Sequence, residues 1–355
     1  MIISRTPFRL SFFGGGTDYP AWFKEHGGAV LGTAIDKYCY LNCRFLPPFF
    51  KHRIRVVHSK IENCEHIDEI SHPAAREILR FLKIERGVEI HHDGDLPARS
   101  GMGSSSAFTV GLLNALYALR GVMPDKHRLA KEAIVMEQAI LKETVGCQDQ
   151  VMTAYGGFNH IVFQPNGAFS VQPVTLSATR LEELNQHLML FYSGVERTAS
   201  VVADTYVLDI QDKKRQLHIM AGLLNEALAI LNGGGSLLPF GELMHEAWLE
   251  KRSLSSKVSN PFLDELYSAA RSAGALGGKL TGAGGGGFLL LFVRPELRDA
   301  VRQRLSHLIH VPFKFEFSGS QIIFFEPQEN YSTENLNLHP PVLVDTDAPH
   351  AEFKR

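Results

Sequence analysis

The 355-residue sequence has few of the features that mark secreted, membrane or nucleic-acid-binding proteins. It has four cysteines with no Cys-x-x-Cys pair, which argues against a disulfide framework or a zinc site and indicates free thiols in a reducing compartment. A formal net charge of -2 provides no basic excess for nucleic acid or an anionic membrane surface. No apolar run approaches the roughly 20 residues of a membrane helix, and no signal-peptide core is present. We therefore expect a cytoplasmic protein with neither nucleic acid nor a membrane as a partner.

Glycine is abundant, with 31 residues, and it gathers around three segments at residues 14–16, 101–103 and 277–287. The middle segment stands between a strand-like run at residues 88–92 and an apolar helical run at residues 107–119. Glycines without a Cβ let backbone amides approach a ligand, and the first amides of a helix lack internal partners. Strand, glycine turn and helix start together predict an anion site, most often for phosphate. The alternative is a serine-capped helix that follows an ordinary turn.

Short β-rich runs alternate with amphipathic helices in the first half of the chain, which predicts an α+β fold. Turn residues separate these runs, and a Pro-Asn-Gly turn predicts a hairpin at residues 156–176. The expected strands are residues 2–6, 8–13, 29–35, 38–45 and 54–58. The expected helices are residues 19–25, 73–82 and 125–142, and Asp125 is expected to cap the last of them.

The second half repeats the mixture, and its order predicts helices packed on an antiparallel sheet. Strands are expected at residues 187–192, 288–293, 312–317 and 321–325, with three or four helices between residues 198 and 273 and another helix after Pro295. We expect domains at residues 1–183 and 184–328, followed by an extended tail at residues 329–355 that is rich in proline, asparagine and charge.

Glu137 lies on the apolar face of the helix expected at residues 125–142, in line with Ala130, Ile134 and Leu141. A carboxylate that faces a core is costly unless it is paired or binds a metal. The pattern leaves open a functional carboxylate or a half-exposed glutamate beside a basic partner.

Two aspartates stand beside glycines. Asp149, in the segment GCQDQ, follows that helix and is expected to project from a fixed loop, either as a catalyst or as a cap. Asp18 and Thr17 follow the first glycine cluster, which offers either room for a substrate near the backbone or a plain turn and helix cap.

Taken together, these segments resemble the GHMP kinases, the family of galactokinase, homoserine kinase and mevalonate kinase. The family's three motifs have counterparts in order at residues 9–19 (RLSFFGGGTDY), 97–107 (PARSGMGSSSA) and 279–287 (KLTGAGGGG). The segment ending at Asp149-Gln150 is similar to the catalytic-aspartate loop of galactokinases. The resemblance spans about residues 7–325 and implies a first domain like ribosomal protein S5 domain 2 and a ferredoxin-like second domain.

The resemblance also implies roles for individual residues, with ATP and Mg²⁺ as cofactors. Asp149 would accept the proton of the attacking hydroxyl, and Arg9 would keep Asp149 ionised and stabilise charge on the transferred phosphoryl group. Ser105 and Glu137 would hold Mg²⁺. The ATP-binding residues would be Pro97, Gly101, Met102, Gly103, Ser104, Ser105 and Ser106. The substrate-binding residues would be Gly15, Gly16, Thr17, Asp18, Arg197, Arg252, Lys257, Gly284 and Gly285.

One departure from galactokinases concerns the substrate. Galactokinases carry Glu-His before Thr-Asp, whereas this chain has Gly15 and Gly16, so galactose is disfavoured. The Gly-Gly-Gly-Thr-Asp version is similar to the bacterial D-glycero-D-manno-heptose 7-phosphate kinases, which phosphorylate the anomeric O1. A sugar that already carries phosphate needs cationic partners, which Arg197, Arg252 and Lys257 could supply; each is otherwise an exposed basic residue.

Two alternatives to a heptose phosphate kinase stay open. Another sugar 1-kinase, similar to fucokinase, would not need its basic residues to contact a phosphate. Some GHMP relatives are sensors that bind ligand without turnover, but a sensor has no need of Ser105, Glu137 and Asp149 together.

Overall fold

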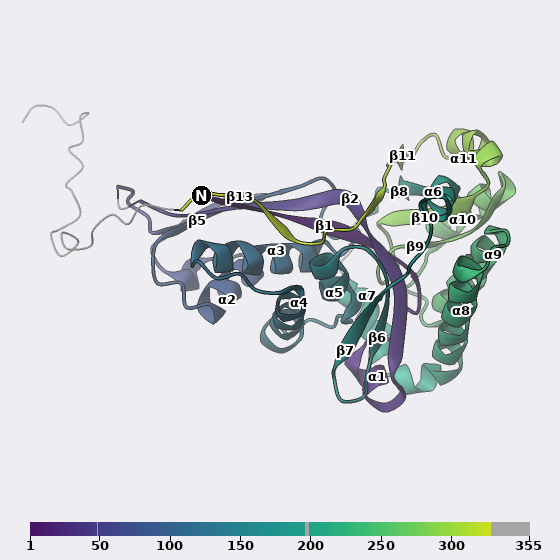
Figure 1. The fold of residues 1–355 in the computed structure, drawn as a ribbon, viewed down its shortest axis with the longest axis horizontal. Helices are drawn as coiled ribbons and strands as arrows, with labels where there is room; N and C mark the ends of the chain where they lie inside the picture. The colour runs from purple at the N-terminus through teal and green to yellow at the C-terminus, as the bar shows by residue number, and fades with distance from the viewer. Residues whose placement is uncertain (48, 196–198, 328–355) are drawn as a thin grey trace, which may run out of the picture.

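The computed structural model describes residues 1–47, 49–195 and 199–327, which fold around two sheets (Figure 1). The first sheet has nine strands, with the path β13-β1-β2-β5-β3-β4 and with β6, β7 and β12 joined to it through β2. Its strands are β1 (Ile2–Phe13), β2 (Gly28–Phe45), β3 (Ile54–Val57), β4 (Ile61–Cys64), β5 (Val88–Gly94), β6 (Phe158–Phe163), β7 (Phe169–Pro173), β12 (Phe315–Glu316) and β13 (Gln321–Phe325).

β1 and β2 form the long central pair of this sheet, and each was expected as two short strands. That expectation is wrong because the pairing shifts register between Pro7 and Phe8 without ending. Pro7 is opposite Tyr38 and Phe8 is opposite Ile35, so residues 36 and 37 form a bulge on β2 rather than a turn. In Figure 1, β2 bends as it runs from the β5 side of the sheet to the β6 side.

Helices cover one face of the β1–β2–β5 part of the sheet (Figure 1). They are α2 (Pro73–Phe81), α3 (Ser104–Leu119), α4 (Lys126–Ile134), a π-helical continuation η2 (Val135–Ile140) and α5 (Gln148–Tyr155), with η1 (Ile67–Glu69) before α2 and α1 (Pro20–His26) near β6. α3 is buried along most of its length, as its nearly continuous apolar sequence requires. Asp125 caps α4 by accepting a hydrogen bond from the Arg128 amide, as predicted.

The second sheet has the order β11-β8-β10-β9, and all of its pairs are antiparallel, as predicted. Its strands are β8 (Leu188–Tyr192), β9 (Ala275–Leu280), β10 (Phe288–Val293) and β11 (Ile309–His310). Its helices are α6 (Ala178–His187), α7 (Ala199–Val207), η3 (Ile210–Lys213), α8 (Lys214–Asn232), α9 (Leu238–Ser253), α10 (Pro261–Ser272), η4 (Pro295–Leu297) and α11 (Arg298–Arg304).

The last two strands do not complete the second sheet, contrary to expectation. β12 pairs with β2 and β13 pairs with β1, so the chain returns to the first sheet after β11. The return is fixed where the Asp36 amide donates to the Lys314 carbonyl oxygen at 2.9 Å and the Lys314 amide donates to the Asp36 carboxylate at 2.8 Å. Residues 312–325 therefore belong structurally to the first sheet, and the expected tail at residues 329–355 lies outside the described residues.

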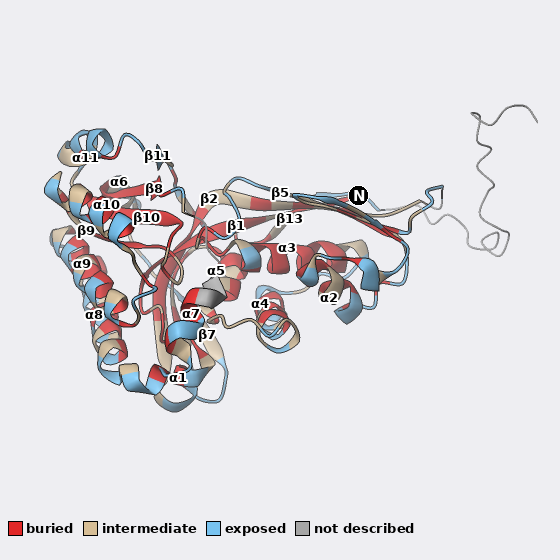
Figure 2. Cartoon of the chain, turned by 180° about the vertical axis from the view of Figure 1, so that it is seen from behind, coloured by how far each residue is buried: buried red, intermediate tan, exposed pale blue. Residues whose placement is uncertain are grey.

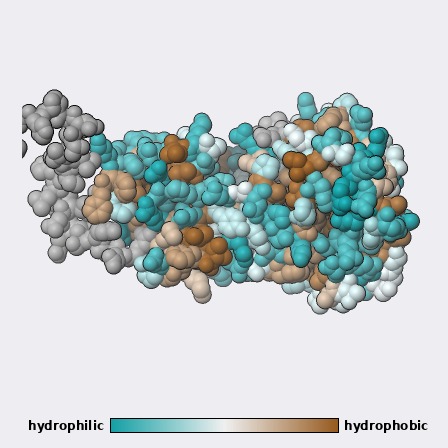
Figure 3. All heavy atoms as spheres, turned by 90° about the horizontal axis from the view of Figure 1, so that it is seen from above, coloured by the Kyte–Doolittle hydropathy of each residue, from teal (hydrophilic) through white to brown (hydrophobic). Residues whose placement is uncertain are grey.

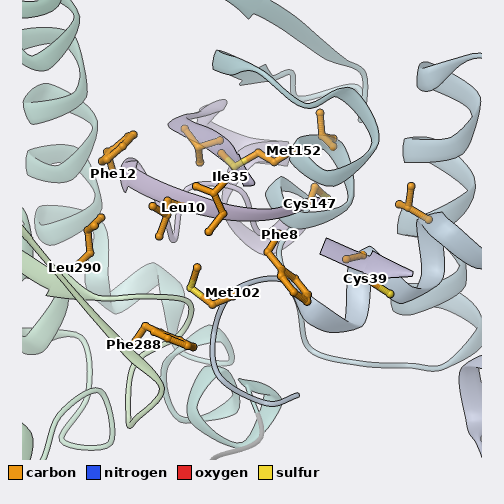
Figure 4. Packing of buried hydrophobic residues seen from close by; sticks show 14 of the residues in the cluster. Phe8, Leu10, Phe12, Ile35, Cys39, Met102, Cys147, Met152, Phe288 and Leu290 are labelled. Carbon is orange, nitrogen blue, oxygen red and sulfur yellow. The ribbon is translucent and has the colours of Figure 1, made fainter. Parts of the chain in front are cut away.

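Buried residues from both sheets form one hydrophobic cluster, and Figure 2 shows buried segments throughout both sheets. Phe12 on β1 packs edge to face against Phe240 on α9, and Figure 4 shows Met102 between the β1 core and Phe288 of β10. The surface seen from above is mostly hydrophilic with small, separate apolar groups (Figure 3). Within the described ranges, no helix has the length and apolar character needed to cross a membrane. All four cysteines are buried free thiols, as expected.

Candidate active site

The segment at residues 97–107 forms a glycine turn that leads directly into α3, as predicted. Gly101 and Gly103 have φ angles of 76° and 75°, a region that favours glycine, and Gly103 stands at the cap position before Ser104. The cap position provides no side-chain acceptor, so the first amides of α3 are available to an anion. Ser104 is half-buried and Ser105 is exposed beside them.

Arg9 and Asp149 form a bidentate ion pair at this turn. Arg9 Nε donates to Asp149 Oδ1 at 2.7 Å and Arg9 Nη2 donates to Oδ2 at 2.6 Å. The third nitrogen, Nη1, donates to the Gly101 carbonyl oxygen at 2.7 Å. The Arg9 side chain is 3% exposed, whereas that of Asp149 is 26% exposed, so the carboxylate is the member of the pair that a ligand can reach.

Asp149 lies in the first turn of α5 and not on a loop, so that part of the expectation is wrong. The segment reads as a loop because glycine and cysteine precede it, but Cys147 is the residue before the helix and α5 begins at Gln148. The helix fixes the carboxylate more firmly than a loop would, and the predicted pairing with Arg9 is present.

Glu137 is buried, with 1% of its surface exposed, and no basic residue forms an ion pair with it in the described part of the chain. Its Oε2 atom accepts hydrogen bonds from Ser106 Oγ at 2.9 Å and from Gln150 Nε2. Its Oε1 atom has no partner among residues 1–47, 49–195 and 199–327. Burial, with Glu143 as the second cause, raises the pKa of Glu137 to about 8. The structure therefore excludes a half-exposed glutamate with a basic partner.

An orphaned, buried carboxylate oxygen beside the glycine turn that starts α3 fits a hard divalent cation. Mg²⁺ commonly takes one or two protein carboxylates and completes its shell with water and substrate phosphates. A metal ion would also offset the cost of ionising Glu137. The structure places Ser106, not Ser105, on Glu137; the Ser105–Glu137 ligand pair stays a prediction.

The loop at residues 14–18 lies against the start of α5. A Cβ on Gly15 would be 3.5 Å from Gln148 Nε2 and 3.6 Å from Ser11 Oγ, so Gly15 packs at contact distance against α5 and β1. The Asp18 carboxylate accepts hydrogen bonds from the Gly16 amide at 2.9 Å and the Gln148 amide at 3.2 Å, and burial raises its pKa. Asp18 is fully buried and joins this loop to the helix that carries Asp149.

Thr17 does not face a substrate. Its residue is 1% exposed, and its hydroxyl is shared between the carbonyl oxygens of Gly14 and Ala29, at 2.8 and 2.9 Å. It also accepts from the Ala29 amide at 3.0 Å. The expectation that Thr17 holds a sugar hydroxyl is therefore corrected: its single donor is used to close the loop.

The third glycine segment, residues 277–287, packs against the turn before α3 and against two further loops. A Cβ on Gly287 would stand 2.0 Å from the Ser100 carbonyl oxygen, so only glycine allows this approach. The Gly287 amide donates to Val195 at 2.8 Å, and the Gly285 amide donates to Val258 at 2.7 Å. Substrate contacts of Gly284 and Gly285 stay a prediction.

The three basic residues that were predicted to bind the substrate phosphate differ in their surroundings. Arg252 is paired with Asp264 at 2.6 Å, so it is not a free cation. Lys257 is exposed and directly precedes Val258, which contacts the third glycine segment. Arg197 lies outside the described residues, two positions after Val195.

Gln150 is the site residue to which sequence analysis gave no role. It is fully buried and its amide nitrogen donates to Glu137 Oε2. The two residues are 13 positions apart on different helices, so no local spacing connects them. Its place directly after Asp149 was the only signal in the sequence.

Comparisons with known proteins indicate the family. Residues 69–157 match the GHMP kinases N terminal domain, and residues 222–310 match the GHMP kinases C terminal domain. D-glycero-alpha-D-manno-heptose 7-phosphate kinase from Campylobacter jejuni is 26% identical over 310 residues, which is 83% of this chain and 90% of that protein. The bifunctional fucokinase/GDP-fucose pyrophosphorylase of Arabidopsis thaliana is 27% identical over 84% of this chain but only 30% of its own length.

A solved structure described as a D-glycero-D-manno-heptose 1-phosphate kinase from Bacteroides thetaiotaomicron shares the fold. Its TM-score is 0.74 at 23% sequence identity, covering 94% of this chain and all (100%) of that one.

Proposed function

The chain belongs to the GHMP kinases, and on this basis we propose that it is an ATP-dependent sugar kinase that phosphorylates the anomeric O1 of D-glycero-D-manno-heptose 7-phosphate. The product would be the 1,7-bisphosphate, in nucleotide-activated heptose synthesis. The observation that carries the proposal is the Arg9–Asp149 pair, held at the phosphate-binding turn through the Gly101 carbonyl oxygen.

Asp149 is the proton acceptor in this mechanism. Each carboxylate oxygen accepts one hydrogen bond from Arg9 and keeps a lone pair for the O1 hydroxyl of the sugar. As the O1–H proton passes to Asp149, O1 forms a bond to the γ-phosphorus of ATP, and the bond from that phosphorus to the β–γ bridging oxygen breaks. ADP leaves, and the protonated Asp149 then releases its proton to solvent.

Arg9 orients the base and adds positive charge beside the transferred phosphoryl group. Its three hydrogen bonds fix the guanidinium, so little reorganisation is needed during the reaction. The amides at the start of α3 would hold the phosphates of ATP. Glu137 would hold Mg²⁺, which would supply charge neutralisation when bound.

The heptose phosphate assignment rests on Gly15 and Gly16, which stand where galactokinases carry Glu-His, and on the relative from Campylobacter jejuni. Without the glutamate and histidine side chains of galactokinases, the loop would accept a sugar other than galactose. A phosphate at the far end of a heptose needs cations, and Lys257 directly precedes Val258, which contacts the third glycine segment.

A fucokinase-like sugar 1-kinase is the second candidate. The Arg252–Asp264 ion pair favours it, because an arginine that already has a carboxylate partner is less available to a substrate phosphate. The similarity to the Arabidopsis enzyme adds support. The two candidates differ in whether the acceptor sugar must carry a phosphate.

The decisive experiment measures ADP release with heptose 7-phosphate, unphosphorylated heptose, fucose and galactose side by side. The proposal predicts that only heptose 7-phosphate is an efficient substrate and that the new phosphate is on O1 by NMR. Fucose turnover above heptose 7-phosphate turnover would select the second candidate. No ADP release with any sugar, at saturating ATP and Mg²⁺, would favour a ligand-binding sensor.

Variants then test the phosphate contacts. Arg197→Ala and Arg252→Ala should raise KM for heptose 7-phosphate by roughly ten- to a hundredfold while KM for ATP stays nearly constant. Arg302→Ala is the matched control, because Arg302 also pairs with an aspartate, Asp299, but on α11. Equal effects on phosphorylated and unphosphorylated heptose would remove these residues from the phosphate site.

A further inference from the structure

A bulge lies in β1 immediately before the sugar loop at residues 14–18. Ser11 is opposite Gly32 and Phe13 is opposite Leu31, so Phe12 is left out of the pairing with β2. A bulge frees backbone groups from the ladder and changes the direction of the strand. The freed carbonyl oxygen of Phe12 accepts a hydrogen bond from Lys279 Nζ at 3.0 Å.

Lys279 belongs to the second sheet. It lies on β9, opposite Leu290 of β10, and it is 4% exposed. Its single hydrogen bond within the described residues is the one to Phe12, and no carboxylate there is within ion-pair distance. Asp18 attracts it and Arg9 repels it, while burial is the main cause of the lowering of its pKa to about 7.

An ammonium group in such a place is expensive. A buried charge without a carboxylate partner costs free energy, and an apolar side chain of the same size would often fit a core at lower cost. Packing of the core alone therefore does not explain a lysine at position 279. The contact that it makes is specific, because it joins the second sheet to the one carbonyl group at which β1 departs from its ladder.

The same residue opens the third glycine segment. Gly287, at the other end of that segment, lies against Ser100 of the phosphate-binding turn. Lys279 thus connects the strand that leads to the sugar loop with the segment that supports the nucleotide turn. Figure 4 shows Phe12 at the end of β1 and Leu290 of β10 within the same core.

We propose that Lys279 is a positioning residue that fixes the loop at residues 14–18, so that the second sheet determines where the acceptor sugar binds. The inference rests on the proposed kinase function for its kinetic consequence but not for its structural one. Lys279 touches neither reacting group; it acts through the Phe12 carbonyl and the loop that follows.

Lys279→Met keeps an unbranched chain of similar length and removes the ammonium group. Loss of one hydrogen bond from a charged donor should raise KM for heptose 7-phosphate by about ten- to a hundredfold, with a change of less than about threefold in KM for ATP. Amide hydrogen exchange in the peptide that covers residues 13–19 should become faster in the absence of any ligand.

Lys251→Met is the matched control. Lys251 is also a buried lysine, 6% exposed, and its Nζ donates to the Gly282 carbonyl oxygen of the third glycine segment, away from Phe12. It should leave exchange at residues 13–19 unchanged. Lys279→Arg provides the second test, because it keeps a donor and a charge and should restore slow exchange at least in part.

The outcomes separate the two proposals. A wild-type protein without kinase activity would refute the proposed function, but exchange in residues 13–19 would still test Lys279. Unchanged exchange in Lys279→Met, or equal exchange in Lys279→Met and Lys251→Met, would overturn the positioning role. If Lys279→Met does not fold, Lys279→Arg decides. Wild-type amide exchange at residues 13–19 and a wild-type KM for heptose 7-phosphate in Lys279→Arg would support the positioning role. A folded Lys279→Arg that loses affinity for the sugar and for ATP alike would refute it.

Discussion

Replacement of Glu137 by glutamine should stabilise the folded protein while it weakens the use of Mg²⁺. The wild-type carboxyl group is buried, its Oε1 atom has no partner among the described residues, and its pKa lies at about 8 instead of 4.5. At pH 7 the unfolded chain carries an ionised Glu137, whereas the folded chain holds it protonated. Folding must therefore take up a proton at this site.

The size of the effect follows from linkage. A carboxyl group with a raised pKa contributes most to stability below its unfolded pKa, and that contribution is lost as the pH rises toward the folded pKa. Each pH unit between 4.5 and about 8 costs roughly 1.4 kcal/mol, which gives about 3 to 4 kcal/mol at pH 7. Glu137→Gln keeps the shape and removes this cost.

Urea unfolding of the wild type and the variant at pH 5 and pH 7, without Mg²⁺ or nucleotide, measures this free-energy cost. The variant should gain stability relative to the wild type by about 2 to 3 kcal/mol between the two pH values. In kinetic assays the variant should need a higher Mg²⁺ concentration for half-maximal rate, because it lacks a charged oxygen ligand. An equal stability difference at both pH values would show that Glu137 is already ionised in the fold, and an unchanged Mg²⁺ dependence would make it a structural residue.

Three further changes test the site. Asp149→Asn should keep the wild-type circular dichroism spectrum and ATP affinity but lower kcat by about a hundredfold or more, and near-normal turnover would remove Asp149 from proton transfer. Thr17→Val should lower the free energy of unfolding by about 1 to 3 kcal/mol, because a buried hydroxyl and its acceptors lose their bonds; a KM effect without loss of stability would instead indicate a substrate contact. Gly287→Ala should lower the melting temperature and the affinity for ATP, because its Cβ would lie 2.0 Å from the Ser100 carbonyl oxygen. Gly194→Ala is the control for backbone strain alone, because Gly194 also has a positive φ but no neighbouring atom near its Cβ position.

Local patterns in the sequence predicted the elements that depend on local chemistry. The Asp125 cap of α4 and the hairpin of β6 and β7 were confirmed, because turn residues and caps act on their immediate neighbours. The position of Glu137 on an apolar helix face left a buried or a half-exposed side chain open, and the structure has it buried. The Arg9–Asp149 pair came from the family resemblance, since nothing local connects residues 140 positions apart.

The predictions that the structure contradicts concern residues whose conformation depends on segments distant in the sequence. Residues 36 and 37 resemble a turn, but the unbroken β1–β2 pairing turns them into a bulge. Thr17 was expected to bind the substrate, yet it is buried and its hydroxyl bonds to the Ala29 backbone, which supplies both a donor and an acceptor. β12 and β13 pair with β2 and β1, and no pattern in their own residues identifies those partners.

The return of β13 to β1 has a consequence for synthesis on the ribosome. β1 is among the first segments to be made, yet its partner on the outer side is residues 321–325. Until that stretch leaves the ribosome, one side of β1 has no neighbouring strand and offers its backbone groups to any other chain. The first sheet therefore cannot be completed before the second has been synthesised, and a chain that stops after the second sheet would leave the strand that carries Arg9 with an open edge.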